Sequence, residues 1–345
     1  MTGAGRRGLR AGIAAARRAR RGVAMLAALW LVVGITIVAL DFALAAQERR
    51  ALGIAAADRA RASAAALGAF ALTRAQLEYA LRAGPQSTAG SVGRLQSSDP
   101  WLGVDSLYSG VEMVDSLPVV VAAADLGAKL NINALSETEL RTFFSYLLGD
   151  YVLSDQLAQC ISDWRDVDDI PRTKGGERDD YIKAGLLRLP ANQDIRDLEE
   201  LLDVKGMTPE IYALVSPYLT TVGAAQVNLN SAPVPVLRVL PGMTDEIISR
   251  ILQLRSRGSR ITSVAEVMPQ PRGGVSDRVA AAMQAQSQNA QSQISARAGV
   301  MTQQVELTIL AKASPAAKPV RLRVVLGRAN INGQPAAGVL NEEWR

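Results

Sequence analysis

The sequence predicts an α+β protein in which a long N-terminal helix precedes an antiparallel sheet, with an all-α domain inserted into that sheet. Three observations predict this arrangement. A charge-free apolar stretch leads into an amphipathic one near the N-terminus, valine-rich segments occur in two separate batches, and helix-start and helix-stop signals fill the region between the batches. The chain has 345 residues, which is long enough for two or three packed units.

Composition excludes several classes of function. The chain has no histidine, and Cys160 is its single cysteine, so histidine general bases, internal disulfides and thiolate metal sites are excluded. The formal charge of +5 suggests a nucleic-acid partner, but seven arginines precede residue 23, where no acid occurs. The other 31 basic residues face 33 acids, so the surplus belongs to a short N-terminal arm. Such an arm is typical of the cytoplasmic flank of a membrane helix.

The N-terminal region predicts a membrane helix that continues into solvent. Residues 23–40, "VAMLAALWLVVGITIVAL", carry no charge and have about the length needed to cross a bilayer core. Residues 47–83 contain no proline and keep helical apolar spacing, so we expect one helix that stops at "AGPQSTAGS", residues 83–91. A signal peptide cleaved after "ALA" (43–45) or "LAA" (44–46) is the alternative, but it does not usually lead into a helix of about 90 Å.

Strand signals flank the middle of the chain. Residues 92–130 contain "SLYSGVEMV" and "LPVVVAAADLGAKLNIN", which are valine-rich and interrupted by Gly, Pro and Asp. Residues 300–313 and 318–329 alternate apolar and polar side chains, which predicts a β-hairpin. We expect these segments to form one small sheet that packs on the exposed half of the long helix.

The residues between the two batches carry helix punctuation and two internal echoes. Ser136 and Glu139 form a capping box, and Gly149 is placed to end the helix that follows. "LNINALS" (130–136) recurs as "VNLNSAP" (227–233), and "GMTPEI" (206–211) recurs as "GMTDEI" (242–247). In each Asn-x-Asn motif two amides lie on one face of a strand end, where they can cap the next turn. The repeated hairpins resemble SAM-like or helix-hairpin-helix modules.

DNA binding is the rival interpretation of such hairpins. Helix-hairpin-helix modules hold phosphate with backbone amides at a Gly-x-Gly turn and with nearby basic residues. Here "LPGMTDEI" has one glycine, and acids follow it directly, which repels phosphate. Residues 130–270 also lack the surplus of positive charge that a membrane-anchored DNA receptor of the competence type needs.

The segment "DWRDVDDIPRTKGGERDDY", residues 163–181, concentrates acidic side chains. Its seven carboxylates belong to Asp163, Asp166, Asp168, Asp169, Glu177, Asp179 and Asp180. Three interpretations are open: a glycosidase-like catalytic pair, a solvated loop, or a calcium site with hard oxygen ligands and two glycines that let the chain fold back. The acid spacing does not fit an EF-hand, and the four basic residues of the loop offset only part of the repulsion.

The N-terminus resembles that of a type IV prepilin. A basic leader ends at Gly22, and an apolar helix follows that becomes amphipathic. In that family a dedicated peptidase cuts after the glycine, here between Gly22 and Val23. Most relatives have glutamate at the fifth mature residue, where this chain has Ala27; the K-type minor pseudopilins of type II secretion also lack it. Together with the inserted helical block, the Asn-x-Asn motifs, the acidic loop and the closing "GVLNEEWR", this makes nearly the whole chain similar to the general secretion pathway protein K family.

The resemblance implies a domain organisation. The expected parts are a leader (1–22), a pilin helix (23–91, with its membrane part at 23–46), a first pilin-like sheet part (92–130), an inserted α-helical domain (131–270), a low-complexity linker (271–299), and a second sheet part with the C-terminal tail (300–345).

The resemblance also implies a function. It implies a non-enzymatic subunit at the tip of the periplasmic pseudopilus, anchored by one helix in the inner membrane with a cytoplasmic N-terminus. Its partners would be the I-type and J-type minor pseudopilins, the major pseudopilin, the assembly platform and the prepilin peptidase, with no nucleic acid. Calcium in the acidic loop is implied as well.

Overall fold

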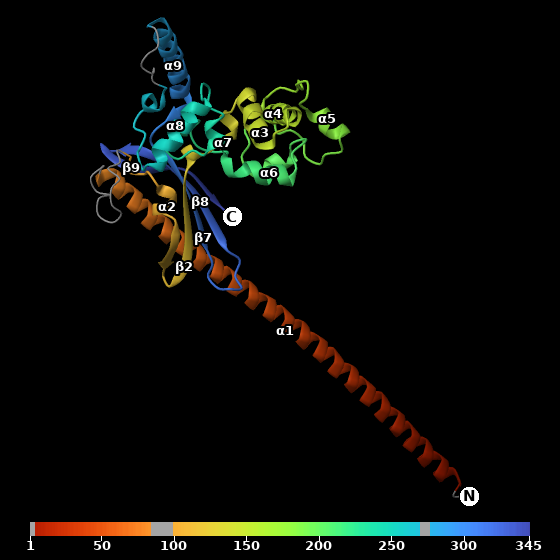
Figure 1. The fold of residues 1–345 in the computed structure, drawn as a ribbon. Helices are drawn as coiled ribbons and strands as arrows, with labels where there is room; N and C mark the ends of the chain where they lie inside the picture. The colour runs from red at the N-terminus through yellow and green to blue at the C-terminus, as the bar shows by residue number, and fades with distance from the viewer. Residues whose placement is uncertain (1–3, 84–98, 270–276) are drawn as a thin grey trace. The chain divides into compact units, whose positions relative to one another are not determined.

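A computed structural model describes the chain except for residues 1–3, 84–98 and 270–276. Two compact units are distinguished: Met1–Arg61 with Ala313–Lys318, and Ala62–Lys312 with Pro319–Arg345 (Figure 1).

The first unit consists mainly of helix α1 (Ala4–Ala83), which also extends into the second unit. Its described large apolar side chains are exposed from Met25 to Ile54, and Trp30 is 73% exposed. Among the described residues, one helix is long and apolar enough to cross a membrane, and it is α1 from Ala28 onward. An exposed apolar surface of this length is unstable in water, so it calls for lipid or neighbouring helices. The predicted continuous helix to residue 83 is confirmed.

The second unit contains a five-stranded antiparallel sheet with the order β1-β2-β7-β8-β9. The strands are β1 (Gly110–Val114), β2 (Leu117–Asp125), β7 (Gln304–Ala311), β8 (Val320–Ile331) and β9 (Gln334–Trp344). Strand β2 alternates buried and exposed residues along its length, as a strand with one covered face does. The predicted hairpin is β7–β8, and the closing "GVLNEEWR" lies largely in the edge strand β9.

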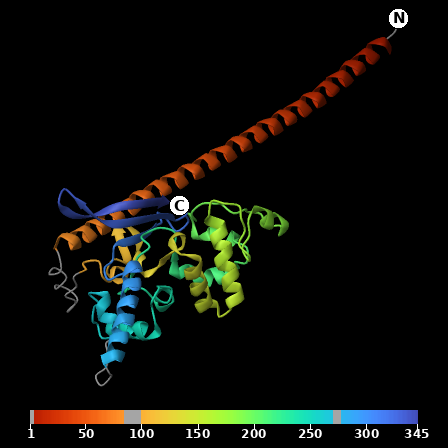
Figure 2. The same ribbon diagram turned by 90° about the horizontal axis from the view of Figure 1, so that it is seen from above.

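The C-terminal part of α1 packs on this sheet (Figure 2). Its buried residues recur at helical spacing and are mostly alanine: Ala62, Ala65, Ala66, Ala69, Thr73, Leu77 and Ala80. The approach is close, because a Cβ on Gly68 would lie 2.7 Å from Val114 Cγ1. Trp101 is fully buried, and its indole N–H donates to the carbonyl of Leu77 at 3.1 Å. Small side chains on one helix face therefore let the helix and the sheet come together.

The inserted region lies between β2 and β7. Its longer helices are α3 (Glu137–Leu148), α4 (Tyr151–Arg165), α5 (Arg178–Lys183), α6 (Pro209–Val215), α8 (Asp245–Ser256) and α9 (Asp277–Arg297). The short α-helices are α2 (Val104–Leu107), which precedes β1, and α7 (Val234–Leu237). The 3-10 helices are η2 (Leu126–Ala128), η3 (Ile132–Ala134), η4 (Leu198–Asp203), η5 (Ser216–Tyr218) and η6 (Val264–Val267). The strand pairs β3 (Leu130–Asn131) with β4 (Leu219–Thr220), and β5 (Val227–Asn228) with β6 (Ala298–Gly299), are parallel.

Local capping follows the sequence signals. Ser136 and Glu139 form the capping box of α3, and Gly149 ends that helix with φ 68°. Thr208 caps α6, which has proline in its first turn, and Thr244 caps α8. The predictions for Ser136, Glu139 and Gly149 are confirmed.

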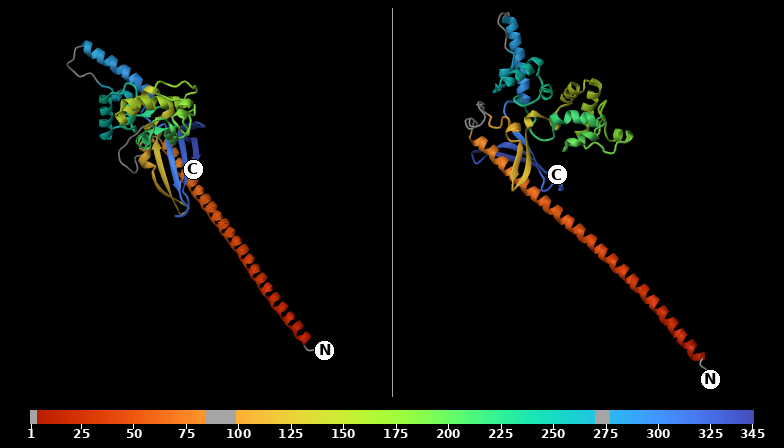
Figure 3. Two further views of the ribbon diagram at one scale, coloured as in Figure 1. Left: turned by 90° about the vertical axis from the view of Figure 1, so that its right-hand side faces the viewer. Right: turned by 60° about the horizontal axis from the view of Figure 1, so that its bottom comes forward.

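Residues 271–299 differ from the linker that we expect from their composition. Residues 277–297 form helix α9, which projects away from the sheet (Figure 3). Alanine and glutamine favour helix, and neither glycine nor proline interrupts this stretch. Ile294 and Ala298 join the same apolar core as Leu130 and Phe143, so this core extends past residue 270. Residues 271–276 lie outside the described part of the chain.

The two Asn-x-Asn motifs hold equivalent places in two structural repeats. In the first, the Asn133 amide accepts from Ile195 N at 2.9 Å and donates to Ile195 O at 2.9 Å. In the second, the Asn230 amide accepts from Ile261 N at 3.0 Å and donates to Ile261 O at 2.9 Å. Each asparagine therefore ties its strand end to a distant loop through the same paired hydrogen bonds.

Each repeat also has an arginine in a long helix, α4 or α8, that donates to two carbonyls: that of the middle residue of the motif and that of the residue two positions after the motif. The donors are Arg165 and Arg255; the acceptors are Ile132 and Leu135 in the first repeat, and Leu229 and Ala232 in the second. Each repeat closes with a two-residue parallel pairing, β3 with β4 and β5 with β6. The inserted region is thus built from two copies of one framework.

Candidate functional site

The acidic loop lies in the first repeat, between α4 and α5. Asp163 belongs to the last turn of α4, Asp166 is its C-cap residue, and Glu177 is the N-cap residue of α5. The loop therefore leaves one helix and enters the next with a carboxylate at each junction.

Three of the seven carboxylates come together. Asp166, Asp168 and Glu177 each offer an oxygen, and these oxygens lie within 4.8 Å of one another. The other four do not belong to this group. Asp169 accepts from Asn192 Nδ2 at 3.1 Å, and Asp180 accepts from Glu177 N at 3.2 Å.

Glu177 is the least satisfied member of this cluster. Its side chain is buried, with 4% of the residue exposed, and no hydrogen bond among the described residues reaches either carboxylate oxygen. Oδ1 of Asp166 is likewise buried without a partner. Burial, and then the negative charges of Asp163, Asp166 and neighbouring acids, raise the pKa of Glu177 to about 7. A buried carboxylate without a donor is costly unless a cation or a proton neutralises it.

Asp163 and Asp179 lie at opposite extremes of exposure. Asp163 is fully buried; its Oδ2 accepts from Gly176 N at 2.8 Å and Arg172 N at 3.1 Å, and its Oδ1 accepts from Arg172 Nη1. Its oxygens thus have partners within the protein. Asp179 is exposed on α5.

The cluster fits a hard divalent cation. Carboxylate oxygens are the ligands that calcium prefers. Of the oxygens of the three side chains, Asp166 Oδ2 already accepts from Arg172 and Asp168 Oδ1 from Ile170 N. An open hollow of about 380 Å³ adjoins the cluster, lined in part by Asp169, Glu177 and Lys183. The unpartnered oxygens of Glu177 and Asp166 are the observation on which the fit rests.

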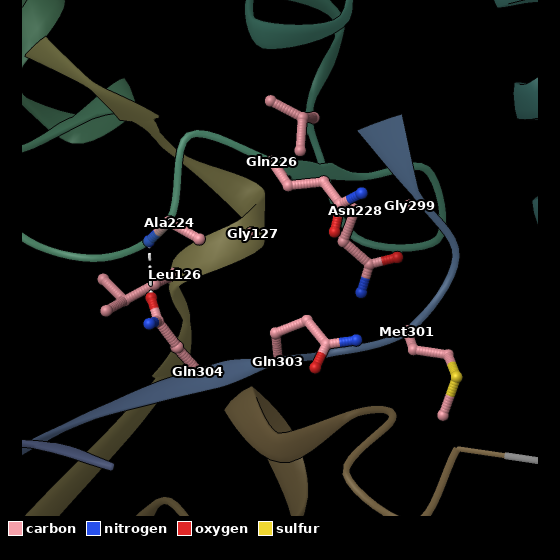
Figure 4. Close-up of a pocket in the computed structure, with 10 residues that line it drawn as sticks. Leu126, Gly127, Ala224, Gln226, Asn228, Gly299, Met301, Gln303 and Gln304 are labelled. Atoms are coloured by element: carbon pink, nitrogen blue, oxygen red, sulfur yellow. Dashed lines mark hydrogen bonds between the residues drawn. The ribbon is translucent and has the colours of Figure 1, made fainter. Parts of the chain in front are cut away.

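A second hollow lies where the second repeat meets the sheet (Figure 4). Gln226, Asn228, Gln303 and Gln304 are among its lining residues, and Gln304 Oε1 accepts from Ala224 N at 2.6 Å. Its volume of about 10 Å³ is close to the space that one water requires. This hollow is too small for an organic ligand.

The remaining sequence predictions concern the cleavage site and DNA. Gly22 and Val23 lie in the helical backbone of α1, and their side chains are outside the described part of the chain. The glycine turns before α6 and α8 are followed by acids, with Glu210 in the first turn of α6 and Asp245 in that of α8. This arrangement does not favour phosphate binding.

The architecture is that of a pilin-like protein: the C-terminal part of a long helix packs on an antiparallel sheet, and a helical domain is inserted into the sheet. A solved structure supports this class: a chain of the GspK-GspI-GspJ complex from the enterotoxigenic Escherichia coli type 2 secretion system superposes with a TM-score of 0.61 at 18% identity, over 83% of this chain and 96% of that one. The expected fold class is confirmed.

Residues 128–224 match the family model "Type II secretion system (T2SS), protein K". A putative type II secretion system protein K of Escherichia coli K12 is 32% identical over 119 residues, which span 32% of this chain and 36% of that protein. The protein K of Dickeya chrysanthemi is 26% identical over 251 residues (57% of this chain, 67% of the relative), and that of Pseudomonas aeruginosa is 26% identical over 251 residues (67% and 72%). The resemblance to the K-type minor pseudopilins of type II secretion is confirmed.

Proposed function

We propose that this chain is a minor pseudopilin of a type II protein secretion system, with a structural role in starting the periplasmic pseudopilus. The observation that carries the proposal is the helical domain inserted between β2 and β7 of a pilin-like sheet whose covering helix continues as an exposed apolar rod. The family match lies inside the inserted domain and supports the same conclusion.

The proposed location follows from the N-terminal helix. The arginines before residue 23 keep the N-terminus in the cytoplasm, the apolar stretch anchors the chain in the inner membrane, and the folded units lie in the periplasm. A prepilin peptidase cuts between Gly22 and Val23. The released apolar rod then packs against rods of neighbouring pseudopilins.

A position at the fibre tip is supported by the presence of the inserted domain and by the residue at position 27. A bulky inserted domain obstructs any subunit stacked above it. Ala27 replaces the glutamate that in relatives pairs with the N-terminal amine of a neighbour, and a topmost subunit has no such neighbour above it. The partners are I-type and J-type minor pseudopilins, as in the complex named for the structural relative, together with the major pseudopilin and the assembly platform.

The role is assembly and not catalysis, and the cation proposed for the acidic loop is structural. Asp166, Asp168 and Glu177 would hold calcium, whose charge offsets the repulsion among them. By joining the end of α4 to the start of α5, the bound ion stabilises the loop between them.

N-terminal sequencing of the membrane-extracted protein tests the class of protein. The expected mature chain begins at Val23, and a Gly22→Asp variant should keep its leader and fail to restore secretion to a strain that lacks the wild-type protein. A mature chain that begins after residue 45 instead means a signal peptide and overturns the proposal. Tight DNA binding by the chain at low salt, measured by mobility shift, would favour the competence-type receptor.

A further inference from the structure

The two repeats differ most in one connection. Arg165 and Ile195 in the first repeat are equivalent to Arg255 and Ile261 in the second, because they make the same hydrogen bonds. The first repeat connects its pair through residues 166–194. The second repeat covers the same connection with residues 256–260. The second copy builds the same hydrogen bonds without the longer segment, so those bonds do not depend on residues 166–194. In the first repeat this segment also adds Tyr181 to the apolar core, where its ring lies 5.7 Å from that of Trp164. We call this segment the insert.

One framework residue differs in a way that matches the insert. Asp163 stands two residues before Arg165, and the equivalent residue before Arg255 is Gln253, which is exposed. Asp163 is 0% exposed. An ionised carboxylate is rarely buried unless charge and hydrogen bonds compensate it, so its burial here requires a specific reason.

The compensating contacts of Asp163 come from the insert. They are the backbone amides of Gly176 and Arg172 and the Arg172 guanidinium. A Cβ on Gly175 would lie 1.9 Å from Asp163 Oδ2, so only glycine lets the chain pass this close. Asp163 therefore fixes the backbone directly before Glu177.

Arg172 extends this contact to a second carboxylate of the cluster. Its Nη1 also donates to Asp166 Oδ2 at 2.5 Å, while Asp166 Oδ1 is left without a partner. The Arg172 guanidinium thus bridges Asp163, whose oxygens both have protein partners, and Asp166, which has one oxygen without a partner. The bridge fixes which oxygen of Asp166 is available to a cation.

We propose that Asp163, acting through Arg172 and the Gly176 amide, is a positioning residue for the cation site and does not itself bind the ion. This inference rests on the cation site proposed above. It assigns different roles to acids that are indistinguishable by composition: Asp166, Asp168 and Glu177 bind, and Asp163 holds the loop in the binding geometry.

Calcium titration of the full chain in detergent tests the first role. Isothermal calorimetry of Asp163→Asn should show an affinity at least tenfold weaker than wild type. Asp194→Asn changes an exposed acid of the same segment that does not line the hollow, and it should bind as wild type does. An unchanged affinity for Asp163→Asn overturns the positioning role. Should Asp163→Asn fail to fold, Arg172→Gln provides the same test with Asp163 intact.

Terbium luminescence separates a positioning residue from a ligand. At saturating Tb³⁺, lifetimes in H₂O and D₂O count the waters on the bound ion, and loss of a carboxylate ligand adds water. Asp168→Asn should increase that number, whereas Asp163→Asn should leave it unchanged while weakening affinity. An increase for Asp163→Asn would make it a ligand and overturn the assignment.

Removing the insert tests the repeat argument independently of any ion. Replacing residues 166–194 with the sequence of residues 256–260 removes α5, and it should give a chain that keeps the other helices and unfolds cooperatively, but without calcium binding. A chain that no longer folds shows that the segment belongs to the framework, which overturns the repeat argument. If the wild type binds no calcium while this variant folds, the proposed cation site fails and the repeat architecture stands.

Discussion

Glu177→Gln should stabilise the cation-free protein at alkaline pH and abolish its response to calcium. The folded protein raises the pKa of Glu177 from its ordinary 4.5 to about 7, because the side chain is buried beside other carboxylates. When folding raises the pKa of a carboxyl group, that group does not lower the free energy of unfolding below its ordinary pKa. The free energy of unfolding then falls as the pH rises from about 4.5 through 7. This rise in the pKa of Glu177 corresponds to a loss of about 3 kcal/mol in the free energy of unfolding above pH 7, where the ionised side chain is buried without a hydrogen-bond donor.

The measurement is denaturant unfolding of the full chain at pH 5 and pH 8, with EDTA or with calcium. In EDTA at pH 8, Glu177→Gln should be more stable than wild type by up to about 3 kcal/mol, and at pH 5 by much less. Calcium should raise the stability of wild type at pH 8 and leave the variant unchanged, because the cation stabilises only a chain that binds it.

Asp194→Asn is the matched control, because it removes an exposed acid from the same segment, away from the hollow beside Glu177. It should follow wild type in both buffers. Two results would refute the reasoning: a Glu177→Gln variant no more stable than wild type in EDTA at pH 8, or one that keeps the full response to calcium.

Two further substitutions test the loop geometry and the repeat. Gly175→Ala places a Cβ 1.9 Å from Asp163 Oδ2, so it should lower the free energy of unfolding by about 3 kcal/mol and weaken calcium binding. Gly110→Ala, with open space around its Cβ, is the control. Equal effects of the two substitutions would contradict the packing argument. Asn230→Ala removes three part-buried hydrogen bonds and should cost about 3 kcal/mol in urea unfolding, whereas Asn341→Ala, at an exposed position, should cost under about 0.5 kcal/mol. A small effect of Asn230→Ala would show that the motif does not hold the second repeat together.

The fold could be predicted where local chemistry decides the structure. Ser136 caps α3 because its hydroxyl and the Glu139 carboxylate satisfy each other's backbone donors within one turn. The long helix follows from unbroken apolar spacing. Helix α9 was missed because a glutamine- and alanine-rich sequence is equally typical of a linker; what distinguishes it is the burial of Ile294, which depends on residues far away in the sequence.

The sequence predicts the position of the candidate site but not which of its acids form the cluster, for a related reason. Acid density identified the loop, but seven similar carboxylates give no indication of which of them converge. Their roles depend on where α4 ends and on which acid Arg172 reaches, and both are properties of the folded loop. The separation of Asp163 from the cluster therefore required the structure.

The internal echoes show how a local motif and a structural repeat can differ. The Asn-x-Asn echo marks the true repeat, because Asn133 and Asn230 make the same paired bonds to Ile195 and Ile261. The Gly-Met-Thr echo does not. Its first copy begins α6, which follows the loop tied by Asn133, whereas its second copy begins α8, which precedes the loop tied by Asn230.

Both Gly-Met-Thr copies have glycine at positive φ and threonine as N-cap, because any tight entry into a helix favours that chemistry. A repeat is therefore established by long-range contacts that recur in the same order, and a recurring turn sequence alone does not establish one. By that criterion α4 and α8 are equivalent, and the acidic insert is an addition to the first copy alone.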